Sequence, residues 1–254
     1  MTSTAVSLCS AFLAPAPAPS RVRTWDVVRA ANAQHGRCGD VAFALPLGSG
    51  RAVIVVVDVI GHGAAPAPLS SAIGDAIATA LLRGASPAQA LGCADNRLRT
   101  LAAESPYAVA FAALVHPSRT LVYASAGHDL AFALHDDGRI EQLAPTAPML
   151  GIALVFRACD AVLPLDTTET LVIATDGVAD SHPAGSKNFF SVAQVARVVK
   201  QSLREDGDPA RAVLDAACAY GGGRQNDDMG VVVARVGTAE PLSRYGKILE
   251  RCIR

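Results

Sequence analysis

The sequence predicts an α+β fold in which largely antiparallel β-sheets carry helices on their outer faces. The first observation is the order of the predicted elements, which runs strands, two helices, strands, two helices and a final strand. Most strands follow one another without a helix between them, which favours antiparallel sheets over a doubly wound parallel sheet. The second is the composition, with 51% hydrophobic and 18% charged residues, which argues against disorder. The third is the length of 254 residues, enough for one large domain or two small ones.

The first half of the chain predicts a hairpin followed by two helices. A Gly-Ser-Gly turn signal at 48–50 joins two strands, and the second contains the apolar run 52–57. An uninterrupted run of this kind is expected for a strand that is covered on both faces. Ser86 and Gln89 are spaced as a capping box at the start of the second helix. The expected elements are strands 39–47 and 51–59, a helix over 64–83 with apolar residues every four positions, and a helix that begins at Ser86-Pro87.

The second half predicts short strands and a second pair of helices. Ser191 and Gln194 form another capping-box pattern, and Asp208 before Pro209 marks the start of the last helix. The expected strands are 107–116, 119–126, 130–135, 153–162, 169–175 and 229–236, and the expected helices are 191–203 and 208–220.

The ends of the chain differ in composition from the rest. Residues 1–20 contain a Pro-Ala alternation and are interpreted as a flexible leader. Residues 21–238 are expected to form the folded domain. Residues 239–254 form a C-terminal tail, interpreted as a solvated end, with a short exposed helix as the alternative.

Charge and cysteine content exclude several classes of protein. The net charge is −1 and the pI about 6.6, so there is no basic field for nucleic acid or anionic lipid. No apolar run reaches the roughly 18–20 residues that span a bilayer. The six cysteines include no CxxC pair and are expected to be reduced, mostly buried thiols of a soluble cytoplasmic protein. His35, His116, His135 and His182 show no ligand spacing and are expected at the surface.

Aspartates follow or precede several of the predicted strands. The chain carries them in the pieces CGD, VVVDVIGHG, LVIATDGVAD and GGGRQNDDMGVVV. Any one of them is an ordinary turn or a solvated loop, but together they predict carboxylates that meet at one end of a sheet. Such a cluster repels itself unless cations neutralise it, and hard oxygen ligands suit Mg²⁺ or Mn²⁺. The aspartates are Asp40, Asp58, Asp176, Asp227 and Asp228.

The motifs around these aspartates resemble a known family. The order GD, D-x-x-G-H-G, A-G-H, T-D-G and D-D is similar to that of SpoIIE/RsbU/RsbX-type metal-dependent protein Ser/Thr phosphatases of the PPM group. The similarity covers about residues 36–236. The segment 185–190 also resembles the family's Gly-x-x-x-Phe-Gly stretch, with Ser191 in place of the last Gly. The single-domain layout resembles RsbX-like members.

The resemblance implies a fold and a metal site. The fold is a four-layer α-β-β-α sandwich, and the site holds two Mn²⁺ or Mg²⁺ ions at one end of the paired sheets. The implied ligands are Asp58 between both ions, Asp40, Asp176, Asp227 with Asp228 as the alternative, and the backbone carbonyl of Val59.

The implied chemistry is attack by a metal-activated water on a phosphoserine or phosphothreonine ester. His62 either donates a proton to the leaving group or caps the following helix. His128 is interpreted as a hydrogen-bonding turn histidine, with a direct catalytic role as the alternative. The helix pair after Gly63 is hypothesised to be a regulatory switch that affects metal binding.

The resemblance also suggests a substrate and a pathway. The expected substrate is a phosphorylated STAS-domain regulator in a partner-switching pathway of the anti-sigma or stressosome type, and thus in stress-response signal transduction. One alternative is a catalytically weak, phosphatase-like module that captures a regulatory phosphoprotein. Another is a small-molecule phosphomonoesterase, for which Arg37 is the one nearby cation.

Overall fold

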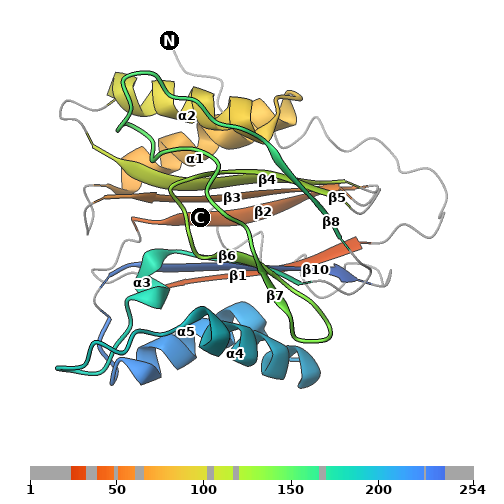
Figure 1. Ribbon diagram of the computed structural model, residues 1–254, viewed down its shortest axis with the longest axis vertical. Coiled ribbons are helices and arrows are strands. Elements are labelled where there is room, and N and C mark those ends of the chain that lie inside the picture. Colours follow the sequence, from red (N-terminus) through yellow and green to blue (C-terminus); the bar gives the residue numbers. More distant parts are fainter. Residues whose placement is uncertain are drawn as a thin grey trace, which may run out of the picture.

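Two stacked antiparallel sheets with a helix pair on each outer face form the molecule (Figure 1). The structure is a computed structural model that describes residues 24–32, 39–48, 51–60, 66–101, 106–116, 120–165, 170–225 and 227–237. This arrangement confirms the predicted four-layer α-β-β-α sandwich.

The first sheet has the strand order β2-β3-β4-β5-β8, and α1 and α2 cover its outer face (Figure 1). All of its strand pairs are antiparallel. Its elements are β2 (Val41–Gly48), β3 (Arg51–Val59), α1 (Ala67–Leu82), α2 (Pro87–Leu101), β4 (Ala108–His116), β5 (Thr120–Ala126) and β8 (Ala161–Pro164).

The second sheet has the order β1-β10-β9-β6-β7, and α4 and α5 pack on its outer face. Its strand pairs are antiparallel as well. Its elements are β1 (Thr24–Asn32), β6 (Ala131–Leu134), β7 (Ile140–Gln142), β9 (Thr170–Ala174), α3 (Asp176–Ala179), α4 (Val192–Arg204), α5 (Pro209–Tyr220) and β10 (Met229–Gly237).

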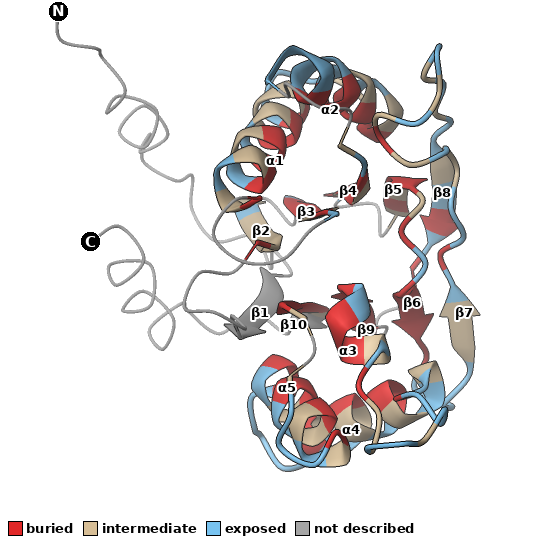
Figure 2. Cartoon of the chain, turned by 90° about the vertical axis from the view of Figure 1, so that its left-hand side faces the viewer, coloured by how far each residue is buried: buried red, intermediate tan, exposed pale blue. Residues whose placement is uncertain are grey.

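Alternation along the strands creates three apolar layers. Figure 2 shows the buried residues concentrated in the strands and in the parts of the helices next to the sheets. In β3, Ile54 and Val56 face the other sheet, whereas Val55 and Val57 face α1 and α2. In β10, Val232 faces the first sheet. Because successive side chains of a strand point to opposite faces, this parity also fixes which positions at the strand ends look into the space between the sheets.

Both predicted capping boxes are present. The backbone N–H of Ser86 donates to Gln89 Oε1 at 2.9 Å, and that of Ser191 donates to Gln194 Oε1 at 2.9 Å. Each serine hydroxyl accepts from the backbone of its partner in return. These side chains satisfy amide groups that the first turn of a helix leaves without a partner.

One expected strand is largely wrong, and three observed elements were not expected. Of the strand expected over 153–162, only the last two residues are in a strand, as the start of β8. The residues before them run along α2, which they contact at Ala153 and Asp160. The strands β1 and β7 and the short helix α3 were not predicted. The proposed leader 1–20 and tail 239–254 lie outside the described residues.

Two expectations about single side chains are also corrected. His135 is buried and not a surface residue, and its Nε2 lies 3.2 Å from Glu141 Oε2. Cys93 and Cys159 are exposed and Cys218 is half-buried, so the expected burial of the thiols is wrong for these three. No helix in the described ranges has the length and apolar content needed to cross a membrane.

Candidate metal centre

The predicted aspartates come together at one end of the sandwich, which we call the acidic end. Asp40 directly precedes β2 and Asp58 is the penultimate residue of β3. The register of these two strands pairs Val41 with Val57, so the next step along the ladder places Asp40 opposite Asp58. Both positions share the parity of Ile54 and Val56 and therefore lie on the face toward the second sheet.

The second sheet brings Asp176 to the same end through the junction of β9 with β10. The Thr175 N–H donates to the Gly230 carbonyl at 2.9 Å, and the Gly230 N–H donates to Thr175 Oγ1 at 2.8 Å. Gly177 then lies directly against the backbone carbonyl of Asp228, where any side chain would collide. These contacts fix the start of α3 beside the start of β10.

The adjacent Asp227 and Asp228 differ in their surroundings. Asp228 is buried, and its Oδ2 accepts a hydrogen bond from the Gly39 N–H. Asp227 is only half-buried, and its Oδ1 accepts from the Asp228 N–H at 2.7 Å. Asp228 thus ties the chain before β2 to the chain before β10, joining the two sheets at the acidic end.

The carboxyl groups of the acidic end oppose one another's ionisation. Burial raises the pKa of Asp58 to about 9, with further contributions from the charges of Asp40, Asp176 and Asp227. Burial likewise raises the pKa of Asp40 to about 7, with the charges of Asp228, Asp176 and Asp227 adding to it. A hydrogen bond with Thr175 acts in the opposite direction on Asp40. These groups are close enough to share one electrostatic environment.

Asp176 and Asp180 extend the acidic end outward along α3. Although Asp176 as a whole residue is exposed, loss of hydration raises the pKa of its carboxyl, which hydrogen bonds to that of Asp58. Loss of hydration also raises the pKa of Asp180, and the charge of Asp227 makes the next largest contribution in the same direction. The charge of Asp129 contributes to this shift as well.

The donor set fits a hard divalent cation. Asp40 Oδ2 is buried with no hydrogen-bond partner among the described residues, an arrangement that costs free energy unless a cation or water satisfies it. As they stand, no three His, Cys, Asp or Glu side chains among the described residues are grouped so that they could hold a metal ion. We expect a bound cation to draw these carboxyl groups, which already lie at one end of the sandwich, into closer coordination.

The remaining predicted site residues have different outcomes. Val59 belongs to the ladder with Ala108, and its side chain packs under α1 and α2. His62 lies outside the described residues. His128 is fully buried beside Phe111, with ring centroids 6.1 Å apart, and burial lowers its pKa to about 4.

The His128 ring makes no hydrogen bond of normal geometry, although the Ala174 backbone lies near enough to affect its pKa. The Ser125 hydroxyl donates to the His128 carbonyl at 2.7 Å and holds the turn. The structure therefore gives this residue a structural place in the turn, remote from solvent.

Sequence reasoning missed Thr175, Asp180 and Asp129 as members of this environment. The signal for Asp180 was the spacing of four residues from Asp176, which places both on one face of a helix. Thr175 belongs to the T-D-G motif and Asp129 follows the A-G-H motif, but nothing in the sequence indicates that their side chains take part in the site.

Comparisons with known proteins agree with this architecture. Residues 48–237 match the family model described as Stage II sporulation protein E (SpoIIE). None of the curated protein sequences matches the chain.

Several solved structures share the fold. The SiaA-PP2C domain of Pseudomonas aeruginosa is 23% identical, with a TM-score of 0.69 over 82% of this chain and 85% of that chain. The RsbU and RsbW domains of Rv1364c from Mycobacterium tuberculosis are 21% identical, with a TM-score of 0.72 over 91% and 67%. The catalytic domain of the serine/threonine phosphatase PstP, solved with two manganese ions, is 16% identical, with a TM-score of 0.63 over 85% and 99%.

Proposed function

Because the chain belongs to the SpoIIE family of PPM-type protein serine/threonine phosphatases, we propose that it hydrolyses phosphoserine and phosphothreonine esters of a regulatory protein at the acidic end. The observation that carries this proposal is the meeting of Asp40, Asp58 and Asp176 from separate segments, where burial and mutual repulsion raise the pKa of each. Holding these buried carboxyl groups together costs free energy, and binding of a cation there offsets that cost.

We assign the metal ligands by their position in this cluster. The charges of Asp40 and Asp176 both raise the pKa of Asp58, and for this reason Asp58 is assigned to both of two ions. Asp40 supports one side, Asp176 and Asp227 the other, and the Val59 carbonyl adds a backbone oxygen. PstP, one of the structural neighbours, holds two manganese ions.

Asp227 is preferred over Asp228 as the ligand on the β10 side. The charge of Asp227 raises the pKa of Asp58, Asp176 and Asp180, and we infer from this that its carboxyl faces the shared space. The carboxyl of Asp228 is already engaged by the Gly39 amide and is assigned to holding the two sheets together.

Divalent ions at this site supply a water of lowered pKa and a positive clamp for phosphoryl oxygens. The protein contributes carboxylates at the ends of strands, and Thr175 and Gly177 fix the start of α3, where Asp176 lies. His128 is too deeply buried to exchange protons with a substrate.

The substrate we propose is a phosphorylated STAS-domain protein of a partner-switching system, with the chain acting in the cytoplasm. The support is by analogy, since one structural neighbour carries RsbU and RsbW domains and another comes from work on the bacterial stressosome. The metal assignment does not depend on this choice.

The test compares p-nitrophenyl phosphate and a phosphorylated STAS-domain protein as substrates, with and without Mn²⁺, for wild type and Asp58→Asn. We expect Mn²⁺-dependent release of phosphate from both substrates and a loss of about three orders of magnitude or more in Asp58→Asn. Activity without metal, or full activity of Asp58→Asn, would overturn the mechanism. Tight binding of the phosphoprotein without turnover under any metal would instead favour a binding module.

A further inference from the structure

The loop between Leu150 and β8 carries three exposed aliphatic side chains. Ile152 is 54% exposed, Val155 is 70% exposed, and Leu154 is fully exposed. We call these three residues the loop patch. Side chains of this kind in a group mark an interaction site more often than single exposed leucines do.

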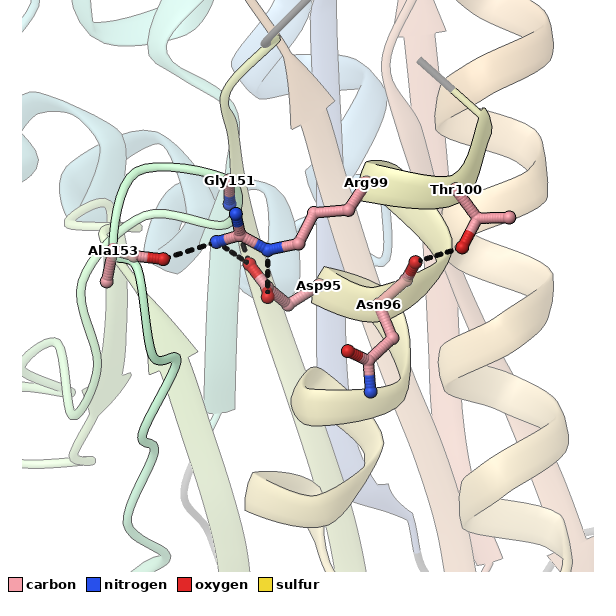
Figure 3. Close-up of polar contacts among 6 residues, drawn as sticks. All are labelled: Asp95, Asn96, Arg99, Thr100, Gly151 and Ala153. Carbon is pink, nitrogen blue, oxygen red and sulfur yellow. Dashed lines mark hydrogen bonds and ion pairs between the residues drawn. The ribbon is translucent and has the colours of Figure 1, made fainter.

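Side chains of α2 hold the backbone on which the loop patch begins, as Figure 3 shows for Gly151 and Ala153. The buried carboxylate of Asp95 accepts from the Gly151 N–H at 2.7 Å and from Arg99 Nε at 2.7 Å. Arg99 also donates to the Ala153 carbonyl. Gly151 has a φ of +85° and lies against the Pro106 carbonyl, so only glycine fits there. The exposed side chains are therefore presented by a backbone fixed on both sides of Ile152.

Backbone hydrogen bonds at the ends of β3 and β4 link the segment that carries the loop patch to the acidic end. The β3–β4 ladder pairs Val59 with Ala108, and the Ile60 N–H donates to the Tyr107 carbonyl at 3.0 Å. Ala108 in turn exchanges hydrogen bonds with Leu150. Ile60 is 57% exposed and Tyr107 is 39% exposed. These backbone contacts place Ile60, two residues beyond Asp58, and Tyr107 on the segments that connect the acidic end with the loop.

We propose that the loop patch, with Ile60 and Tyr107, docks the folded protein substrate beside its phosphorylated residue; this inference rests on the proposed function. A phosphoprotein is attracted to the acidic end only through the bound cations, so selectivity for a protein requires contacts outside that end. Exposed Arg157 on the same loop adds one positive charge for an acidic partner surface.

The size of this surface favours a transient partner over a second copy of the chain. The five exposed side chains together offer on the order of a few hundred Å² of accessible surface. A stable interface buries roughly 800 Å² on each partner. Substrate docking, which must release the product, requires only the smaller area.

The experiment compares three substrates for wild type and the double variant Ile152→Ser/Leu154→Ser in Mn²⁺. The substrates are a phosphorylated STAS-domain protein, a phosphoserine peptide copied from it, and p-nitrophenyl phosphate. We expect kcat/KM for the protein to fall at least about tenfold, mainly through KM, with the peptide and p-nitrophenyl phosphate unchanged. Val162→Ser on β8 is the matched control, because Val162 is an exposed aliphatic residue of an edge strand and lies away from the acidic end.

The other possible results of this experiment contradict the inference in different ways. Equal loss on all three substrates, no loss on the protein, or wild-type preference for the peptide over the protein overturns docking by the loop patch. Absence of any turnover by wild type overturns the proposed function itself and the inference with it. Conversion of a wild-type dimer to a monomer by the double variant, measured by light scattering, assigns the loop patch to a second copy and also overturns the inference.

Discussion

Burial sets the charge state of individual residues around the acidic end, and His128 is the simplest case. Its ring packs beside Phe111 without a hydrogen-bond partner, and burial lowers its pKa to about 4. Its ordinary pKa is 6.5, so the unfolded chain takes up a proton that the folded protein rejects. The stability from this group is fully present above pH 6.5 and is lost as the pH falls toward 4.

This predicts the behaviour of His128→Gln in urea unfolding. Between about pH 7.5 and pH 5, wild type is expected to lose about 2 kcal/mol relative to the variant, because only wild type has this imidazole to protonate. Comparing the two proteins at each pH cancels the carboxylates, which titrate in both. A pH-independent difference between them would contradict the assigned charge state.

Gly177 is a second residue whose identity the acidic end requires. A Cβ there would collide with the backbone of Asp228, which cannot move without disturbing its bond to Gly39. Gly177→Ala is therefore expected to destabilise by about 1–3 kcal/mol and to weaken Mn²⁺ binding. Gly92→Ala is the control, since the space around Gly92 in α2 is open and alanine should stabilise the helix by up to about 1 kcal/mol. Equal effects of the two substitutions on Mn²⁺ affinity would count against a role of the Gly177–Asp228 contact in metal binding.

At the scale of elements, α2 acts as the support of a loop as well as a cover for the first sheet. Asp95 and Arg99 reach across to Gly151 and Ala153 (Figure 3). The N-terminal turn of α2 holds the other end of the loop, where the Ala88 N–H donates to Asp160 Oδ1 at 2.7 Å. This second role explains why residues 153–160 do not form the strand expected from their composition.

Two Asp–Arg pairs with the same spacing of four residues allow a matched test of this support. Asp95→Ala leaves the Gly151 amide and Arg99 without their buried partner and is expected to cost about 1–3 kcal/mol. Asp215→Ala removes the exposed pair with Arg211 and is expected to cost no more than about 0.5 kcal/mol. Denaturant unfolding of both variants measures the difference, and similar losses would refute a special role for Asp95.

The elements differed in how well they could be predicted from the sequence. The apolar run in β3 and the capping boxes at Ser86 and Ser191 are local signals, and the elements they mark were found nearly to the residue. By contrast, β1 reads TWDVVRAAN, with charged residues among apolar ones. Its strand conformation comes from pairing with β10 along its whole length, which is a long-range property.

At the scale of the whole molecule, the stacking of two sheets brings distant carboxylates into one place. The strand ends that carry Asp40 and Asp58 belong to one sheet, and those that carry Asp176 and Asp227 belong to the other. The sequence predicted that these residues would meet, but it could not distinguish Asp227 from Asp228. Our proposal to prefer Asp227 depends on the bond between Asp228 and the Gly39 amide, which is 189 positions away in the chain.

The stacking of the two sheets also explains why metal binding at the acidic end is coupled to the release of protons. Burial and repulsion raise the pKa of Asp58 to about 9 and that of Asp40 to about 7, so the metal-free site holds protons at neutral pH. A divalent cation must displace them, and its affinity should therefore rise with pH up to the higher of these values.

Calorimetric titration of the metal-free protein with Mn²⁺ near pH 7, in buffers of different ionisation enthalpy, tests the central claim most directly. We predict binding with release of roughly one to two protons, a loss of affinity of at least about tenfold in Asp58→Asn, and no change in Asp215→Asn, whose carboxylate is exposed and paired with Arg211. Absence of Mn²⁺ binding, or binding to Asp58→Asn with wild-type affinity and proton release, would contradict a metal centre at the acidic end.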